Sequence, residues 1–446
     1  TGECIKVYSA MSLSDVDTII GQSHPAFLKW RQVSFEERAV LMLQAAAVIE
    51  SRQDEYACLM ADEMGKPVTA GRAELLKCQK VCRYYAEHAE QQLSSRHIKT
   101  EMSKSYVSYQ PLGTVFAIMP WNFPFWQVFR FAAPNLMAGN TGLLSHAPIS
   151  TGTGEAIEAL FKEAGFPDSV FRSVVVENDV AKHIIQHPQV CAVTLTGSEM
   201  AGRIVGAEAA SSLKKIVLEL GGVDPYVILE DADLELAADS IVRSRMLNTG
   251  QVCIAAKRII AVEAIHDELQ ERVLAKMSAY TMGDPRDEAV NFGPMSREDL
   301  RAKVHQQVQQ NIDAGATLCL GGELPTGPGF YYPPTLLSGL TANMPANSEE
   351  IFGPVACFFM VADEAEAIQL ANDTIYGLSG AVFTRDVAHG EELAAKVINV
   401  GTCFVNSFVA SDSRLPFGGI KASGYGRELS DEGIREFVNI KTVCVA

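Results

Sequence analysis

The segment Asn248-Thr249-Gly250-Gln251-Val252-Cys253 places a cysteine just after a glycine-containing turn, and Glu219-Leu220-Gly221-Gly222 lies upstream of it at the end of an apolar run. A thiolate and a carboxylate from a separate strand end supply the two reagents of acyl-thioenzyme chemistry, a sulfur nucleophile and a base for water. A free thiol has a pKa of about 8.5, so only a few per cent is thiolate at neutral pH unless the site lowers that pKa. The alternative is that Cys253 is one more small buried apolar residue, as most unpaired cysteines are.

Length and composition restrict the class of protein. The chain has 446 residues, of which 48% are apolar and 20% are charged. This length exceeds what one core usually holds, so two large domains are expected. The formal net charge of -17, without any basic run, argues against a nucleic-acid partner. No apolar run approaches the ~18 residues of a membrane span, so no membrane partner is expected.

Cysteine and histidine usage argues against disulfide and metal sites. The ten cysteines are scattered and include no CxxC pair, so neither a disulfide framework nor a zinc ribbon is predicted. Cys78 and Cys82 lie four apart on a predicted helix and are interpreted as one packed face. His183 and His187 lack the glutamate of an HExxH motif. We therefore expect no metal and a reducing compartment, the cytoplasm.

The first hundred residues are predicted to be mainly helical. Ser34 and Glu37 form a capping-box pattern before an apolar-periodic run. A second helix is expected to end at Gly65, where glycine favours the left-handed cap. A third helix is predicted over 71–93, where apolar side chains recur at helical spacing.

From Ser105 the apolar pattern changes to alternating strand and helix segments. Such alternation predicts βαβ units and a mostly parallel sheet, with ligands outside the carboxyl ends of the strands. The fold class is therefore α/β with a nucleotide-binding architecture. The strands are predicted at Tyr106–Tyr109, Gly113–Met119, Thr141–Leu144, Phe171–Val176, Val190–Leu195, Lys215–Leu218 and Tyr226–Leu229.

The loop Thr196–Gly202 is the strongest phosphate-binding candidate. It follows a predicted strand and opens a predicted helix, which places free backbone N–H groups and the positive end of the helix together. The loop is not GxGxxG, so the ordinary dinucleotide fingerprint is absent. A tight turn with close helix packing explains Gly197 and Gly202 equally well.

Six motifs are spread along the chain: Trp121-Asn122-Phe123-Pro124, Gly197 to Gly202, Glu219 to Gly222, Asn248 to Cys253, Glu350-Ile351-Phe352-Gly353-Pro354 and Pro416-Phe417-Gly418-Gly419-Ile420-Lys421. In order and spacing they resemble the motifs of the NAD(P)-dependent aldehyde dehydrogenases, and most closely those of the short bacterial succinate-semialdehyde dehydrogenases. The resemblance covers essentially the whole chain.

The resemblance implies a domain organisation. It implies a Rossmann-type cofactor domain over 1–102 and 112–225 and an α/β catalytic domain over 226–423. Residues 103–111 and 424–446 would form β-strands that pair between subunits of a homodimer or homotetramer. The cofactor would be NAD or NADP, and the substrate a small aldehyde.

The resemblance also implies roles for individual residues. Cys253 would be the nucleophile and Glu219 the general base, with the Asn122 amide and the Cys253 N–H stabilising the oxyanion. Such a preorganised donor is typically worth a few kcal/mol. The implied cofactor site comprises Pro120, Trp121, Ser145, Gly197, Ser198, Gly202, Leu220, Gly221, Glu350 and Phe352.

The substrate is expected to be succinate semialdehyde, with a broad-specificity aldehyde dehydrogenase as the alternative. Arg130 lies where the succinate-semialdehyde enzymes place an arginine for the substrate carboxylate, and Ser411 and Arg414 lie in the loop that forms the pocket rim. A guanidinium suits a carboxylate as a bidentate fork. Leu247 stands where the long-type enzymes carry a further arginine, and a surface salt bridge of Arg130 remains the competing interpretation.

Two family features that read the adenosine ribose are absent. Ser145 replaces a usual lysine, and Pro148 replaces a glutamate that excludes a 2′-phosphate. We therefore expect both NAD+ and NADP+ to be accepted, with NAD+ modestly preferred. A protonated His146 would partly replace the lysine and raise NADP+ use below about pH 6.5.

Two other classes of function remain open from the residues alone. A thiol hydrolase or acyltransferase would need a histidine to activate Cys253, and none of the nine histidines lies within the six motifs. A non-catalytic binding or structural protein on the same fold would not need Cys253, Glu219 and Asn122 together.

Overall fold

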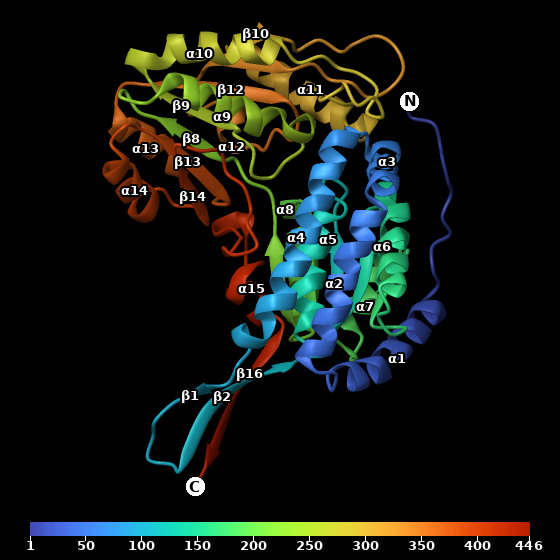
Figure 1. The fold of residues 1–446 in the computed structure, drawn as a ribbon. Coiled ribbons are helices and arrows are strands. Elements are labelled where there is room, and N and C mark those ends of the chain that lie inside the picture. Colours follow the sequence, from blue (N-terminus) through green and yellow to red (C-terminus); the bar gives the residue numbers. More distant parts are fainter.

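The computed structural model describes residues 1–446 and arranges them as two α/β lobes and a protruding strand extension (Figure 1). One lobe is built on a six-stranded sheet, the other on a seven-stranded sheet, and the extension on a three-stranded sheet. The predicted α/β class with mostly parallel sheets is confirmed. None of the helices combines the length and the apolar character that crossing a bilayer requires.

Four helices precede the first large sheet, one more than the sequence predicted. The capping box at Ser34 is confirmed, because the Ser34 hydroxyl accepts from the Glu37 N–H and the Glu37 carboxylate accepts from the Ser34 N–H. The additional helix begins with an equivalent pair, Ser12 and Asp15. The helices are α1 (Leu13–Trp30), α2 (Phe35–Ser51), α3 (Gln53–Met64) and α4 (Val68–Gln92).

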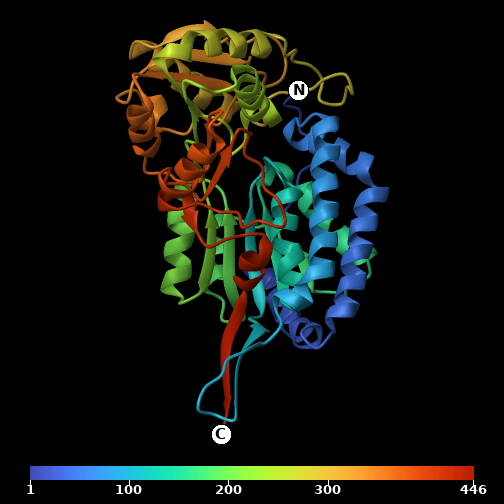
Figure 2. The ribbon, with the colours of Figure 1, turned by 60° about the vertical axis from the view of Figure 1, so that its left-hand side comes forward.

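The six-stranded sheet has the order β15-β7-β6-β3-β4-β5, and only β15 runs antiparallel to its neighbour. Figure 2 shows this sheet between α8 on one side and the N-terminal helices on the other. The strands are β3 (Thr114–Met119), β4 (Thr141–His146), β5 (Phe171–Ser173), β6 (Val190–Thr196), β7 (Lys215–Glu219) and β15 (Gly424–Tyr425). The helices between them are α5 (Trp126–Met137), η1 (Pro148–Ser150), α6 (Thr151–Glu163), α7 (Asn178–Gln186) and α8 (Glu199–Ser211).

The seven-stranded sheet has the order β10-β11-β12-β9-β8-β13-β14 and is parallel except for β10. Its strands are β8 (Pro225–Ile228), β9 (Arg258–Val262), β10 (Thr317–Leu320), β11 (Thr335–Leu340), β12 (Val355–Val361), β13 (Ser379–Phe383) and β14 (Thr402–Val405). The helices that accompany it are α9 (Leu234–Met246), η2 (Leu247–Gly250), α10 (Glu263–Ser278), α11 (Glu298–Asp313), α12 (Pro345–Ser348), α13 (Glu364–Asn372) and α14 (Val387–Lys396).

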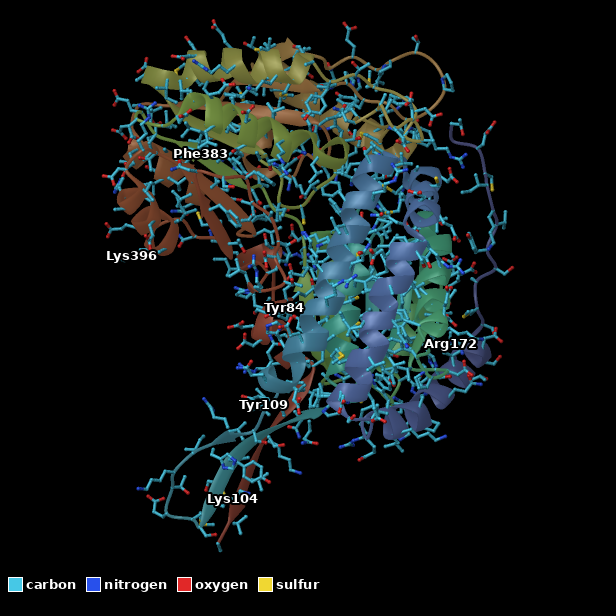
Figure 3. The ribbon with its side chains drawn as sticks, viewed as in Figure 1. Tyr84, Lys104, Tyr109, Arg172, Phe383 and Lys396 are labelled. Carbon is cyan, nitrogen blue, oxygen red and sulfur yellow. The ribbon has the colours of Figure 1, made fainter.

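The extension projects away from both lobes, with Lys104 and Tyr109 labelled on it in Figure 3. It contains β1 (Arg96–His97), β2 (Lys104–Pro111) and β16 (Val438–Val445), and β2 pairs antiparallel with β16 along its whole length. η3 (Lys421–Ser423), β15 and α15 (Ser430–Arg435) precede β16. The segment predicted to pair between subunits thus begins with β15, which lies in the six-stranded sheet, and only β16 reaches β2.

A buried ion pair fixes α4 against α5. Lys66 and Glu74 pair with each side chain about 1% exposed. The other carboxylate oxygen of Glu74 accepts hydrogen bonds from the N–H groups of Phe125 and Trp126, 2.9 and 2.8 Å away, at the start of α5. A carboxylate at a helix N-terminus also interacts favourably with the helix dipole. Glu74 therefore holds in place the helix that carries Arg130.

We expect Glu74→Gln to destabilise the protein by roughly 3 kcal/mol, because removing one partner of a buried ion pair leaves the other charge uncompensated. The measurement is the midpoint of thermal unfolding. Glu87→Gln is the matched control, since Glu87 is an exposed glutamate of the same helix. Equal unfolding midpoints for the two variants would contradict this account of the pair.

Candidate active site

The loop that carries Cys253 has an unusual backbone. Asn248 and Thr249 have φ values of 50° and 55°, and Gly250 follows at 72°. A β-branched residue such as Thr249 rarely adopts this left-handed region, and such strain is typical of functional loops. A side chain at Gly250 would collide with the backbone of Gly353, so the glycine is required by close packing.

Hydrogen bonds of the Arg245, Asn248 and Asn122 side chains hold this loop in place. The buried Arg245 side chain, in α9, donates to the carbonyl oxygens of Gly250 and Gly353, each at 2.5 Å. The Asn248 side chain donates to the Asn122 carbonyl at 2.8 Å, and the Asn122 side chain donates to the Gln251 carbonyl at 2.9 Å. Loops from both large sheets are thereby joined beside Cys253.

Cys253 faces a small cavity of about 90 Å³. Burial raises the pKa of the thiol to about 11, while the charges of Lys257 and Arg130 favour the thiolate. The backbone N–H of Cys253 makes no hydrogen bond within the chain. The Asn122 amide donates one of its two hydrogens to the Gln251 carbonyl, so the other is free to donate to a bound group. The residues that line the cavity are Lys77, Phe123, Trp126, Gln127, Arg130, Ser244, Leu247, Val252, Cys253, Ile254, Phe408, Val409, Ala410, Ser411 and Phe417.

Glu219 ends β7 with a buried carboxylate, and neither of its oxygens has a hydrogen-bond partner. Burial, and then the charge of Glu428, raise its pKa well above the ordinary range, and Arg130 opposes that rise. Gly418, from the Pro416 to Lys421 motif, packs so closely that a Cβ there would lie 2.7 Å from Glu219 Oε1. An unpartnered buried carboxylate with a raised pKa is suited to accept a proton near neutral pH.

Arg130 lies at the cavity, but it already has a carboxylate partner. Its guanidinium pairs with Glu428, whose side chain is 4% exposed, and lies 4.5 Å from the centre of the Phe417 ring. The pair is buried, so it is not the surface salt bridge considered for Arg130, and a role of Arg130 toward a substrate carboxylate stays a prediction. The two buried carboxylates here are Glu428 and Glu219, and the single guanidinium neutralises only Glu428. Its charge therefore opposes the rise of the Glu219 pKa without cancelling it.

The other predicted substrate residues separate into two groups. Ser411 lines the cavity and accepts a hydrogen bond from Lys77 Nζ at 2.6 Å. Arg414 lies outside the cavity, with its side chain 75% exposed and paired with Asp412 at 2.7 Å. Asp412 lies two residues before Arg414, so this local pair leaves the arginine at the surface.

The start of α8 offers the backbone groups that a pyrophosphate requires. Ser198 caps the helix by accepting from the Ala201 N–H at 3.3 Å, while the N–H groups of Glu199 and Met200 have no partner in the chain. Gly202 is needed because a Cβ there would lie 2.5 Å from Leu220. The Thr196–Gly202 loop thus meets the requirements of an anion site at a helix N-terminus, and it fits the phosphates of a dinucleotide.

The predicted nicotinamide side of the site lies on the Glu350 motif. Glu350 pairs with the buried Lys257 at 2.9 Å and accepts from the Gly222 N–H at 3.3 Å. Gly221 packs closely on the Glu350 carboxylate, since a Cβ there would lie 2.3 Å from Glu350 Oε2. The rings of Trp121 and Phe352 meet edge to face, with centroids 5.9 Å apart. Pro120 directly precedes Trp121 after β3.

The histidine beside Ser145 supplies no cation for a 2′-phosphate. Ser145 is buried in β4, and His146 beside it is fully tied to the backbone. Its Nε2 lies 2.9 Å from the Pro124 carbonyl and its Nδ1 accepts from the Ala147 N–H at 3.0 Å, which defines a neutral ring. Burial lowers the pKa of His146 to about 4. The expectation that a protonated His146 would raise NADP+ use below about pH 6.5 is therefore wrong.

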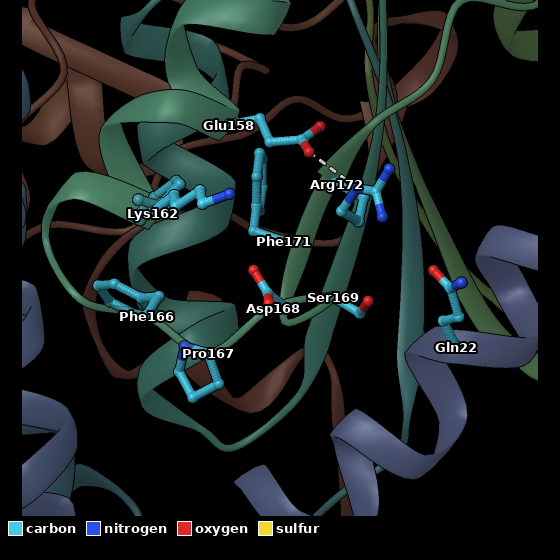
Figure 4. Close-up of a pocket in the computed structure, with 10 residues that line it drawn as sticks. Gln22, Glu158, Lys162, Phe166, Pro167, Asp168, Ser169, Phe171 and Arg172 are labelled. Carbon is cyan, nitrogen blue, oxygen red and sulfur yellow. Dashed lines mark ion pairs between the residues drawn. The ribbon is translucent and has the colours of Figure 1, made fainter.

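A separate hollow lies between α1, α6 and β5 and is shown in Figure 4. Its volume is about 470 Å³, and it contains no cysteine. Glu158 and Arg172 there pair with each other at 2.8 Å, so neither charge is free to act. No cluster of three or more histidine, cysteine, aspartate or glutamate side chains capable of holding a metal ion is present.

Four charged residues of the site were not identified from the sequence: Lys77, Arg245, Lys257 and Glu428. Only Lys77 had a usable signal. It lies three residues after the buried Glu74 and four before the buried Val81, which places it on the packed side of α4. The contacts that join the other three to the rest of the site, Arg245 to Gly353, Lys257 to Glu350 and Glu428 to Arg130, span large sequence separations, so periodicity carries no trace of them.

Comparison with known proteins places the site in context. A model of the aldehyde dehydrogenase family matches residues 1–443. The succinate semialdehyde dehydrogenase [NAD(P)+] Sad of Escherichia coli K12 is 44% identical over 443 residues, which is 99% of this chain and 96% of that protein. The probable succinate-semialdehyde dehydrogenase [NADP(+)] of Synechocystis is 44% identical over 446 residues and is covered to 98%.

A solved structure shares the fold over nearly its whole length. The succinic semialdehyde dehydrogenase from Streptococcus pyogenes, in complex with NADP+ as the cofactor, matches with a TM-score of 0.97 and 37% identity. The match covers 99% of this chain and 97% of that chain. The predicted fold is confirmed by this similarity.

The raised pKa of Cys253 makes a prediction for chemical modification. Iodoacetamide reacts with the thiolate, so the alkylation rate of Cys253 in the free protein should rise about tenfold per pH unit from pH 7 to pH 10 without levelling off. The rate is read by mass spectrometry of the Cys253 peptide, and Cys253→Ala controls for the peptide assignment. A plateau below pH 9 would show that the site favours the thiolate instead.

Proposed function

This chain belongs to the aldehyde dehydrogenase family, and on that basis we propose that it oxidises succinate semialdehyde to succinate with NAD+ or NADP+. The observation that supports this proposal most strongly is the set of residues that line the Cys253 cavity. Ten of its 15 lining residues are apolar, and its charged members are Lys77 and Arg130, without any carboxylate. A cavity with this lining favours an aldehyde that carries a negative charge at its other end.

The nucleophilic step uses groups at the mouth of the Cys253 loop. The Cys253 thiolate attacks the aldehyde carbon, a carbon–sulfur bond forms, and the carbonyl oxygen becomes an alkoxide. The free Cys253 N–H and the second amide hydrogen of Asn122 donate to this oxygen. NAD(P)+, when bound, would supply the acceptor for the hydride of the substrate carbon, and Cys253 would then hold the acyl group as a thioester.

Release of the product requires a base. Glu219 takes a proton from water, whose oxygen attacks the thioester carbonyl, and the carbon–sulfur bond breaks to give the acid and the free thiolate. The raised pKa of Glu219 makes it a stronger base than an exposed glutamate, and Arg130 keeps its ionised form accessible. The buried position also limits the access of bulk water to the carboxylate.

The cofactor is proposed to bind at the C-terminal edge of the six-stranded sheet. Ser198 and the free N–H groups of α8 would receive the pyrophosphate, and Glu350 the nicotinamide ribose, once its contact with Lys257 is adjusted. Ser145 would face the adenosine ribose. The remaining proposed contacts are Pro120, Trp121, Gly197, Gly202, Leu220, Gly221 and Phe352.

The extension supports a proposal on assembly. Its exposed apolar side chains include Ile98 and Met102, each 44% exposed, Ile440 at 60% and Val445 at 48%. Paired strands with apolar side chains are suited to subunit contacts. We propose a homodimer or homotetramer formed through 103–111 and 424–446, with 1–102 and 112–225 as the cofactor domain and 226–423 as the catalytic domain.

The ten free cysteines favour a reducing compartment, the cytoplasm.

The function is tested by following NAD(P)H formation with succinate semialdehyde. Wild type should turn over steadily and should prefer succinate semialdehyde to butanal by at least about tenfold in kcat/KM. Cys253→Ala should form no NAD(P)H. Glu219→Gln should release a burst of about one equivalent and then stall, because its thioester is not hydrolysed.

Binding of NAD+ to Cys253→Ala, followed by fluorescence titration, controls for loss of the fold. Normal steady turnover in either variant would refute the assigned roles. A preference of the wild type for butanal would refute succinate semialdehyde as the substrate.

Cofactor choice gives a separate prediction. Wild type should use NAD+ and NADP+, with a modest preference for NAD+, because the neutral Ser145 and His146 offer the 2′-phosphate no charge. Ser145→Lys should lower the KM for both cofactors, and more strongly for NADP+. Ser145→Met is the control for side-chain length. A large NADP+ preference in the wild type would mean that another basic group reads the phosphate.

A further inference from the structure

Lys77 is the cation of the Cys253 cavity that has no carboxylate partner. Its ammonium donates to Ser411 Oγ at 2.6 Å and lies 4.2 Å from the centre of the Trp126 ring. No aspartate or glutamate oxygen lies within 4.0 Å of it, whereas Arg130 in the same cavity is paired with Glu428. An ammonium has three donors, so two of them remain without a partner in the chain.

The position of Lys77 is costly without an anion. Burial, and then the charge of the nearby Arg130, lower its pKa to about 8, although the more distant carboxylates of Glu74 and Asp412 act in the opposite direction. By comparison, Lys80, three residues later on α4, is exposed to solvent. An ammonium that is partly desolvated and unpaired is stabilised when a carboxylate binds beside it.

Arg130 and Lys77 differ in their partners and therefore in the groups that they can bind. The Arg130 charge is already matched by Glu428 and acts on Glu219. A substrate carboxylate at Arg130 would therefore have to compete with an existing buried ion pair. At Lys77 it would meet an unmatched charge, a hydroxyl and an indole face.

We propose that Lys77 is a specificity-determining residue that binds the distal carboxylate of a short ω-carboxylate aldehyde, with Ser411 as the residue that positions its ammonium. This inference rests on the proposed oxidation of such an aldehyde at Cys253. Since an ammonium is a point charge on a flexible stem, unlike the rigid fork of arginine, the site accepts glutarate semialdehyde as well as succinate semialdehyde.

The test compares Lys77→Met, Lys77→Arg and the control Lys80→Met in steady-state assays with succinate semialdehyde and butanal. Lys77→Met should raise the KM for succinate semialdehyde roughly 10- to 100-fold with a much smaller change in kcat, the range expected for losing a charged hydrogen bond. The preference for succinate semialdehyde over butanal should fall by the same factor. Lys77→Arg should restore most of it, and Lys80→Met should keep the wild-type preference.

A second measurement covers the case in which Lys77→Met does not fold. Succinate should slow the alkylation of Cys253 by iodoacetamide in the wild type, whereas butanol at the same concentration should not. Lys77→Arg should retain this protection. Absence of protection by succinate in the wild type would overturn the proposal.

The outcomes separate this proposal from the function on which it rests. If wild type prefers succinate semialdehyde and Lys77→Met keeps that preference, Lys77 is not the anchor and the proposed function stands. If wild type shows no preference for the acid over butanal, the proposed substrate fails and the Lys77 proposal fails with it.

Discussion

The Asn122 carbonyl is a point at which the two lobes are fixed around Cys253. It accepts from Lys66 Nζ and from the Asn248 side chain, each at 2.8 Å. Lys66 is itself held by Glu74, whose carboxylate receives the first N–H groups of α5. One buried chain of hydrogen bonds thus links α4, α5 and the loop before Cys253. Because every group in it is desolvated, a shift of any member leaves another one unpaired.

Three unfavourable features of the fold lie close to this region. Thr249 has a left-handed backbone, Glu219 is buried without a partner, and Lys77 is a cation without a counter-ion. By contrast, the cores of both sheets consist of apolar side chains with almost no exposure. Strain and unmatched charge persist only where the surrounding structure enforces them, and here the packed sheets provide that enforcement.

The elements that the sequence predicted well are those with a local signal. The strands β3, β6 and β7 are rich in branched apolar residues, and the glycines and serine of Thr196–Gly202 mark a turn into a helix, so their positions were predictable. The helix α1 was missed even though Ser12 and Asp15 form a capping box, because Pro25 lies inside it. The partner of Arg130 was missed for a different reason. Glu428 is brought to it only by the return of the chain to β15, and no local pattern encodes that contact.

The pairing of distant strands has a consequence for biosynthesis. β2 emerges from the ribosome early, but its partner β16 is made more than three hundred residues later, and the edge of β7 likewise waits for β15. Contacts of such long sequence separation form slowly, and unpaired strand edges invite association with other nascent chains. The first lobe must therefore remain folded around an incomplete sheet while the second is translated. Closure of both edges is a late event, which makes the interval of synthesis the period when this chain depends most on chaperones.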